Sequence, residues 1–156
     1  MIVPPRIVSG VSEFAVDAAA RIWAQATAAR DDDPDVAPLE LARPVIACAL
    51  DESANAVLLT AWSVEQQAVG FALALPSAGE AELRFLGVLP RAWGSGVATA
   101  LIDELASELR SRDCSTVDLW VYNDNKRAIG VYERSGWQHD ATRIHPDPES
   151  SNATTS

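Results

Sequence analysis

The spacing of apolar residues changes several times along this chain, and each spacing predicts a different kind of element. After Ser12, which can cap a helix, apolar side chains recur every four residues at Phe14, Ala18 and Ile22. This period matches one face of an α-helix, so residues 12–29 are expected to form an amphipathic helix.

A second, shorter helix is expected after an acidic linker. Residues 31–35 combine four aspartates with a proline, and both features end a helix. Pro44 fits the first turn of the next helix, which is expected to end near Leu50. The linker is interpreted either as a solvated loop or as a surface that attracts a cationic substrate.

Shorter apolar runs, bounded by glycine, proline and polar residues, predict strands. The expected strands cover residues 7–8, 56–63, 68–75, 82–88, 115–122 and 137–144. Further helices are expected at 97–112 and 125–136. This order predicts a single α+β domain over residues 1–145. Residues 146–156 contain no core-forming side chains and are expected to be a disordered tail.

Composition narrows the setting of the protein and its partners. The net charge of −10 argues against binding to nucleic acid or to anionic membranes. No apolar run reaches the roughly 18–20 residues of a membrane helix, and the first residues lack the hydrophobic region of a signal peptide. Cys48 and Cys114 lie far apart without a metal-binding spacing. We therefore expect free thiols in a cytoplasmic protein without a metal site.

The strand at 82–88 leads through Pro90 and the triplet Gly94-Ser95-Gly96 into a helix, an order that suits anion binding. The first N–H groups of a helix have no intrahelical partner, and the helix dipole adds roughly half a positive charge there. Glycine lets a phosphate approach the backbone closely. A Walker loop is excluded because no lysine follows the glycines, and a dinucleotide loop would need a glycine where Thr99 stands.

Two motifs in this chain resemble those of the GNAT superfamily of N-acyltransferases. The acyl-CoA loop V-x-P-x-x-[QR]-G-x-G-[IV]-[GA]-x-x-L is matched by Val88, Pro90, Gly94, Gly96, Val97, Ala98 and Leu101. The motif N-x-x-A-x-x-x-Y-x-x-x-G-[FW] is matched by Asn125, Ala128, Tyr132, Gly136 and Trp137. Trp93 departs from the Gln or Arg that is usual in the first motif, which puts a side-chain contact at that position in doubt.

The resemblance implies the GNAT fold, in which α/β/α layers surround a mixed, mostly antiparallel sheet with one splayed pair of parallel strands. Acetyl-CoA, the implied cosubstrate, would lie between the strands that end at Val88 and Val121. The implied cofactor contacts are Leu86, Gly87, Val88, Gly94, Ser95, Gly96, Val97, Ala98, Thr99, Asn125 and Tyr132. The family usually adds a final strand, so here either that strand is missing or a partner subunit covers the open edge, as in a homodimer.

The resemblance also implies two catalytic residues. Tyr132 would be the general acid, because a phenol is protonated at neutral pH and can donate to the leaving thiolate. Glu82 lies six residues before Val88, where several family members carry a glutamate that deprotonates the amine, often through water. The structural alternatives are a helix tyrosine that packs on the sheet and a strand glutamate that faces solvent.

Together these features predict an acetyl-CoA-dependent N-acetyltransferase. It would transfer the acetyl group to an amine of a small molecule or of a protein N-terminus by direct attack. One alternative is a non-catalytic module that binds or senses acyl-CoA, which would need the glycine loop but not Tyr132. Another is an interaction subunit whose sheet is completed by a partner.

Overall fold

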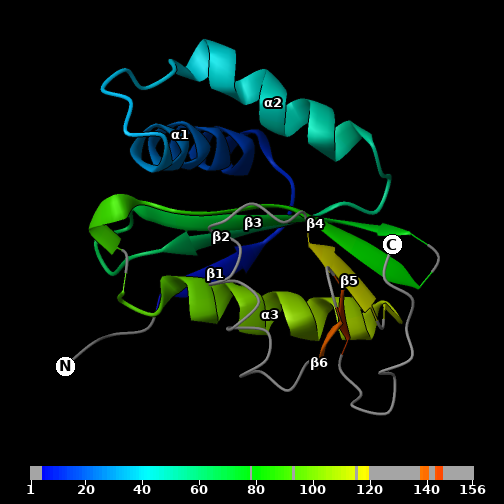
Figure 1. Cartoon of the computed structure of the whole chain (residues 1–156). Coiled ribbons are helices and arrows are strands. Elements are labelled where there is room, and N and C mark those ends of the chain that lie inside the picture. Colours follow the sequence, from blue (N-terminus) through cyan, green and yellow to red (C-terminus); the bar gives the residue numbers. More distant parts are fainter. Residues whose placement is uncertain are drawn as a thin grey trace.

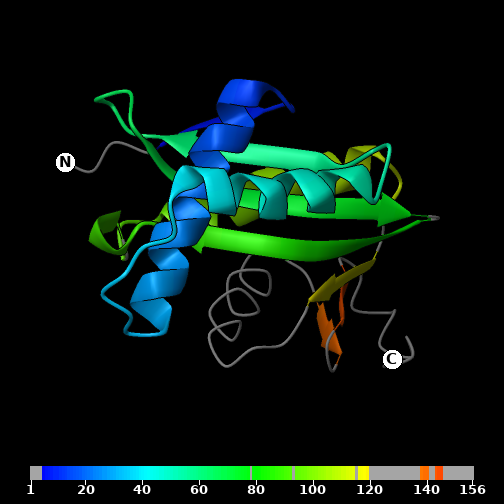
Figure 2. The same ribbon diagram turned by 90° about the horizontal axis from the view of Figure 1, so that it is seen from above.

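The chain folds into three layers, with one sheet between two groups of helices (Figure 1). The computed structural model describes residues 5–77, 79–92, 94–114, 116–119, 138–140 and 143–145. The elements are β1 (Arg6–Ser9), α1 (Glu13–Arg30), α2 (Leu39–Asp51), β2 (Val57–Trp62), β3 (Ala68–Ser77), β4 (Glu80–Val88), the 3₁₀ turn η1 (Pro90–Ala92), α3 (Val97–Ser111), β5 (Thr116–Leu119), β6 (Gln138–Asp140) and β7 (Arg143–His145). Helices α1 and α2 cover one face of the sheet, and α3 covers the other (Figures 1 and 2).

The strands form one mixed sheet in the order β1-β2-β3-β4-β5-β7-β6. Every neighbouring pair is antiparallel except β4 and β5, which are parallel from Glu80 and Thr116 to Leu83 and Leu119. This arrangement confirms the predicted fold class, with a mostly antiparallel sheet that contains one parallel pair.

The end of the sheet differs from the sequence prediction. The strand expected at 137–144 is instead a short hairpin of β6 and β7, and β7 pairs with β5 through Ile144 and Val117. The final strand is therefore present, and β7 and β6 occupy the edge that suggested a partner subunit. Ile144 is the one strongly apolar residue of β7, so pairing with β5 rather than an apolar pattern identifies this strand. The predicted tail, residues 146–156, lies outside the described residues.

Helix α1 begins as predicted, but one residue of its apolar stripe is misplaced. The Ser12 Oγ accepts a hydrogen bond from the Ala15 N–H at 3.1 Å and caps the helix. Ala18 and Ile22 are buried, whereas Phe14 is 69% exposed. Its ring stacks on Trp62 of β2, with 5.2 Å between ring centroids. Phe14 thus covers a strand residue from outside the core.

Helix α2 starts earlier than the proline suggested. It begins at Leu39, so Pro44 lies inside the helix rather than in its first turn. Buried Ile46 lies on the inner side of α2, and Arg43 reaches back to α1. The Arg43 guanidinium lies 3.2 Å from the Asp17 carboxylate and 3.7 Å from that of Glu13. These contacts fix α2 across α1, as seen from above in Figure 2.

Helix α3 packs closely on β3 because of one glycine. The inner side of α3 buries Val97, Leu101, Ile102, Leu105, Ala106 and Leu109. A Cβ on Gly70 of β3 would lie only 2.8 Å from Val97 Cγ1 and 3.0 Å from Leu101 Cδ1. Glycine at position 70 therefore allows the side chains of Val97 and Leu101 to lie directly against the sheet.

Candidate functional site

The loop between β4 and α3 turns the chain sharply at two glycines. The Leu89 N–H still bonds to the Val69 carbonyl at 2.9 Å, and η1 then bends the chain away from the sheet. Ser95 closes the turn, with its Oγ donating to the Ala92 carbonyl at 2.5 Å. Gly94 and Gly96 have φ angles of +80° and +89°. Because side chains disfavour this left-handed region, the backbone here requires glycine.

The turn leaves a row of amides at the start of α3. The first intrahelical bond runs from the Ala100 N–H to the Gly96 carbonyl at 3.0 Å. The N–H groups of Val97, Ala98 and Thr99 precede it and have no carbonyl partner within the helix. No side chain caps Gly96, and the first turn of α3 contains no acidic residue. Helix geometry and the dipole therefore make this end of α3 suitable for an anion.

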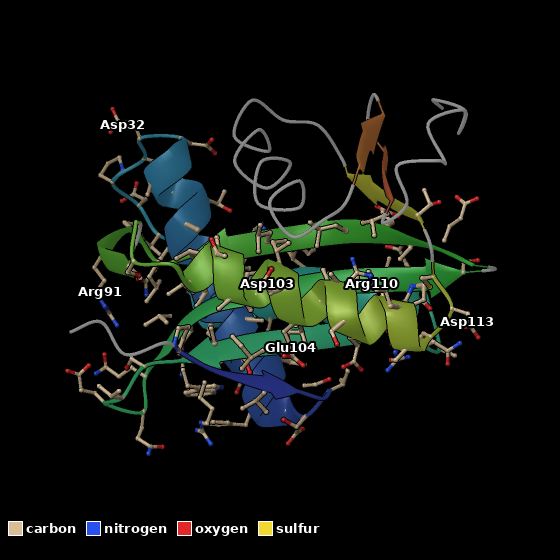
Figure 3. The ribbon with its side chains drawn as sticks, turned by 90° about the horizontal axis from the view of Figure 1, so that it is seen from below. Asp32, Arg91, Asp103, Glu104, Arg110 and Asp113 are labelled. Atoms are coloured by element: carbon tan, nitrogen blue, oxygen red, sulfur yellow. The ribbon has the colours of Figure 1, made fainter. Side chains whose placement is uncertain are left out.

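The predicted loop residues Gly94, Ser95, Gly96, Val97, Ala98 and Thr99 all belong to this turn and the amide row. The first three are exposed, while Val97 directs its side chain into the core. Figure 3 shows Arg91 at this end of α3, with Asp103 and Glu104 farther along the helix. Arg91 is exposed, and its Nη2 donates to Gln67 Oε1 at 3.0 Å. Arg91 thus places a positive charge beside the N-terminal end of α3, ahead of the acidic side chains of Asp103 and Glu104.

Strand β4 contains a bulge where its pairing with β5 ends. Leu73 of β3 pairs with Phe85, but Ala74 pairs with Leu83, so Arg84 is an extra residue in β4. Pairing between β4 and β5 stops at Leu83 in the described residues. Figure 2 shows β5 running at an angle away from β4.

The predicted main-chain contacts Leu86, Gly87 and Val88 follow this bulge. Within the described ranges, no strand pairs with β4 at residues 85–87 on the edge that faces away from β3. Gly87 has a packing reason of its own, because a Cβ there would lie 2.8 Å from the Phe71 ring. The edge itself offers main-chain donors and acceptors to an extended ligand.

The candidate base Glu82 lies on the face of β4 that α1 and α2 cover, and it is held by an arginine. The Arg84 Nε donates to Glu82 Oε2 at 2.7 Å, and Nη2 donates to Oε1 at 3.3 Å. The other side of the same guanidinium donates twice to Glu52, at 2.6 Å for each bond. The Glu82 side chain is 24% exposed, so it is neither fully buried nor fully solvated.

This network shifts the pKa of Glu52 and of Arg84. The hydrogen bonds from Arg84 lower the pKa of Glu52, and those to Glu52 and Glu82 raise the pKa of Arg84. Sequence reasoning missed Arg84 and Glu52. The spacing of Glu82 and Arg84 on one strand was a usable signal, whereas Glu52 comes from the end of α2 and only the fold brings it there.

Two predicted site residues, Asn125 and Tyr132, lie outside the described residues, as does Trp93. In the part of the chain that the structure describes, no group of three or more His, Cys, Asp or Glu side chains could hold a metal ion. Likewise, none of the described helices is both long and apolar enough to cross a membrane. Cys48 and Cys114 are free thiols.

Comparison with known proteins gives a consistent result. A model of the acetyltransferase (GNAT) family matches residues 17–137. The mycothiol acetyltransferase of Beutenbergia cavernae is 36% identical over 87 residues, which are 56% of this chain and 26% of that protein. The aligned part of this chain therefore spans well under half the length of that relative.

Solved structures share the fold at low sequence identity. The ribosomal-protein-S18-alanine N-acetyltransferase of Escherichia coli has a TM-score of 0.63 and 20% identity, and the match covers 89% of this chain and 90% of that one. A phosphinothricin acetyltransferase of Sinorhizobium meliloti, in complex with acetyl-CoA, has a TM-score of 0.64 and 12% identity, with coverage of 87% and 76%. At these identities the likeness concerns the fold alone.

Proposed function

Because this chain belongs to the acetyltransferase (GNAT) family, we propose that it transfers an acetyl group from acetyl-CoA to an amine. The acceptor is a small molecule or a protein N-terminus, and the setting is the cytoplasm. The observation that carries the proposal is the amide row of Val97, Ala98 and Thr99, at the start of α3 and without a side-chain cap. This row suits the diphosphate of coenzyme A.

The cofactor is proposed to lie along β4, with its diphosphate at the start of α3. Its pantetheine arm would pair with the main chain at Leu86 and Val88, as an added strand does. Asn125 would hydrogen-bond the arm, by resemblance to the family. Neutral amides rather than basic side chains would hold the diphosphate, which is how a chain with a net charge of −10 could bind a polyanion.

The proposed reaction is a direct attack on the thioester. The neutral amine nitrogen forms a bond with the acetyl carbonyl carbon, and the carbon–sulfur bond breaks. The leaving thiolate takes a proton from the Tyr132 hydroxyl, and Glu82 accepts the proton lost by the amine, directly or through water. The negative charge around Glu82 and Glu52, together with the acidic chain as a whole, supports a cationic amine as the acceptor.

Turnover of an amine panel with acetyl-CoA, followed by thiol detection, tests this proposal. Tyr132→Phe keeps the ring and removes the proton donor, so we expect kcat to fall by about 10²-fold or more while KM for acetyl-CoA stays within about twofold. Unchanged kcat would remove Tyr132 as the acid. Binding of acetyl-CoA without turnover of any amine by the unmutated protein would favour the non-catalytic module instead.

A further inference from the structure

We propose that Arg84 is a positioning residue that holds the Glu82 carboxylate on β4, in the segment that pairs with β5, and ties it to the end of α2. The inference rests on the proposed function, because it takes Glu82 as the base that receives the amine proton. It assigns no chemical step to Arg84 itself.

The donors of Arg84 are directed mainly at other side chains. One edge of the guanidinium makes two bonds to Glu82 and another makes two bonds to Glu52, at 2.6–3.3 Å. A guanidinium has five N–H donors, and these four bonds engage four of them in two forks. The side chain is 26% exposed, so most of it is also enclosed by protein. Arg84 therefore acts on other side chains rather than on a ligand.

The bulge puts Arg84 where positioning matters. Arg84 and Phe85 both stand opposite Leu73, so two consecutive side chains turn to the same face. Arg84 also follows Leu83, the last residue of β4 that pairs with β5 in the described part of the sheet. The anchored carboxylate of Glu82 thus belongs to the residue just before Leu83, close to where the proposed thioester would lie.

Other acidic groups make an anchor necessary. Glu80 lies two residues before Glu82 on the same strand, and Glu52 approaches from α2. Like charges this close repel one another. Arg84 supplies the positive charge between Glu82 and Glu52, and without it we expect the Glu82 side chain to turn away from its neighbours.

The test is a double-mutant cycle on the acetyltransferase reaction. Arg84→Met alone is expected to lower kcat/KM for the amine by about 10- to 100-fold, with KM for acetyl-CoA within about twofold. Arg84→Lys should recover part of the loss, because lysine keeps the charge but cannot form two forks. Glu82→Gln alone should lower kcat/KM by about 10²-fold or more. In the Glu82→Gln variant, adding Arg84→Met should lower kcat/KM little further, because Arg84 acts by positioning Glu82.

Arg112→Met is the matched control for removal of an arginine. Arg112 bonds to Glu108 within α3 and to the Asn55 carbonyl, away from Glu82, and its loss should leave kcat/KM unchanged. Thermal unfolding and acetyl-CoA affinity report whether each variant is folded. The positioning role is wrong if the two single-variant losses of kcat/KM multiply in the double variant. It is also wrong if Arg84→Met is fully active.

The outcomes also separate this inference from the function on which it rests. If the unmutated protein acetylates an amine and Glu82→Gln is fully active, the positioning role is wrong while the acetyltransferase stands. If the unmutated protein turns over no amine, both are wrong.

Discussion

Two glycines adjoin the start of α3, and each is required for a different physical reason. Gly70 lies on β3 opposite Val97, and Gly96 immediately precedes the helix. A Cβ on Gly70 would lie 2.8 Å from Val97 Cγ1, so glycine there is a packing requirement. A Cβ added to Gly96 would have no neighbouring atom within 4 Å, but the φ angle of +89° disfavours any residue with a side chain. In the sequence, Gly70 lies inside a predicted strand and Gly96 belongs to the glycine triplet. The structure shows that Gly70 is needed for packing and Gly96 for the shape of the turn before the amide row.

Alanine at these two positions should therefore have different effects. Gly70→Ala is expected to lower the free energy of unfolding by about 1–3 kcal/mol through overpacking, with little change in KM for acetyl-CoA. Gly96→Ala should cost about 1–2 kcal/mol of backbone strain and also raise that KM, because it displaces the first turn of α3. Urea unfolding and steady-state kinetics measure both. Equal KM values for the two variants would contradict this distinction.

At the scale of elements, α2 is tied to its neighbours near both ends. Arg43 joins it to Asp17 of α1, and Glu52, the residue after the helix, joins it to Arg84 of β4. The second link crosses from the helical layer to the bulge of the sheet. It therefore sets where the end of α2 lies above the candidate base.

The Glu52 link predicts a pH dependence of stability. The pKa of Glu52 is below its ordinary value near 4.5 in the folded protein, so its contribution to stability is present above that value and is lost as the pH falls through the lowered pKa. Glu52→Gln should thus be less stable than the unmutated protein at pH 7, and the difference should shrink below about pH 4.5. Urea midpoints at several pH values check this. A difference that grows on acidification would contradict it.

The elements show what an apolar pattern can and cannot predict. Helices α1 and α3 and the β2–β3 hairpin could be predicted because their apolar residues follow the spacing or the runs typical of these elements. Strand β3 continues past its predicted end and includes Pro76. Proline has no backbone N–H, but β2 pairs with β3 only as far as Ala74, so no hydrogen bond to β2 is lost at Pro76. The β6–β7 hairpin was missed because its residues carry little apolar pattern.

In the candidate site, the glycine loop could be predicted from a local sequence motif, whereas the tertiary contacts of Glu52 and Arg84 could not. The glycine loop and its amide row follow from a strand, two glycines and a helix within one stretch, and the structure contains that stretch. Glu52 and Arg84 are 32 residues apart, and no periodicity links them. The roles of Tyr132 and Asn125 stay predictions.

At the scale of the whole molecule, the charge distribution agrees with the proposal that backbone amides, rather than basic side chains, hold the diphosphate. The chain is acidic, with Asp103, Glu104 and Asp113 along or beyond α3, while Arg91 lies at the N-terminal end of that helix (Figure 3). The loop that carries Asp32 lies at the same end of the molecule as Arg91 (Figure 3). Negative charge at this end of the molecule supports a binding mode in which backbone amides carry most of the attraction.

A crystal structure of the complex with acetyl-CoA tests the central claim most directly. The account predicts diphosphate oxygens about 2.7–3.2 Å from the backbone nitrogens of Val97, Ala98 and Thr99, and the thioester at the opening between β4 and β5 beside Glu82. Acetyl-CoA bound elsewhere, with these three amides facing only solvent, would contradict it.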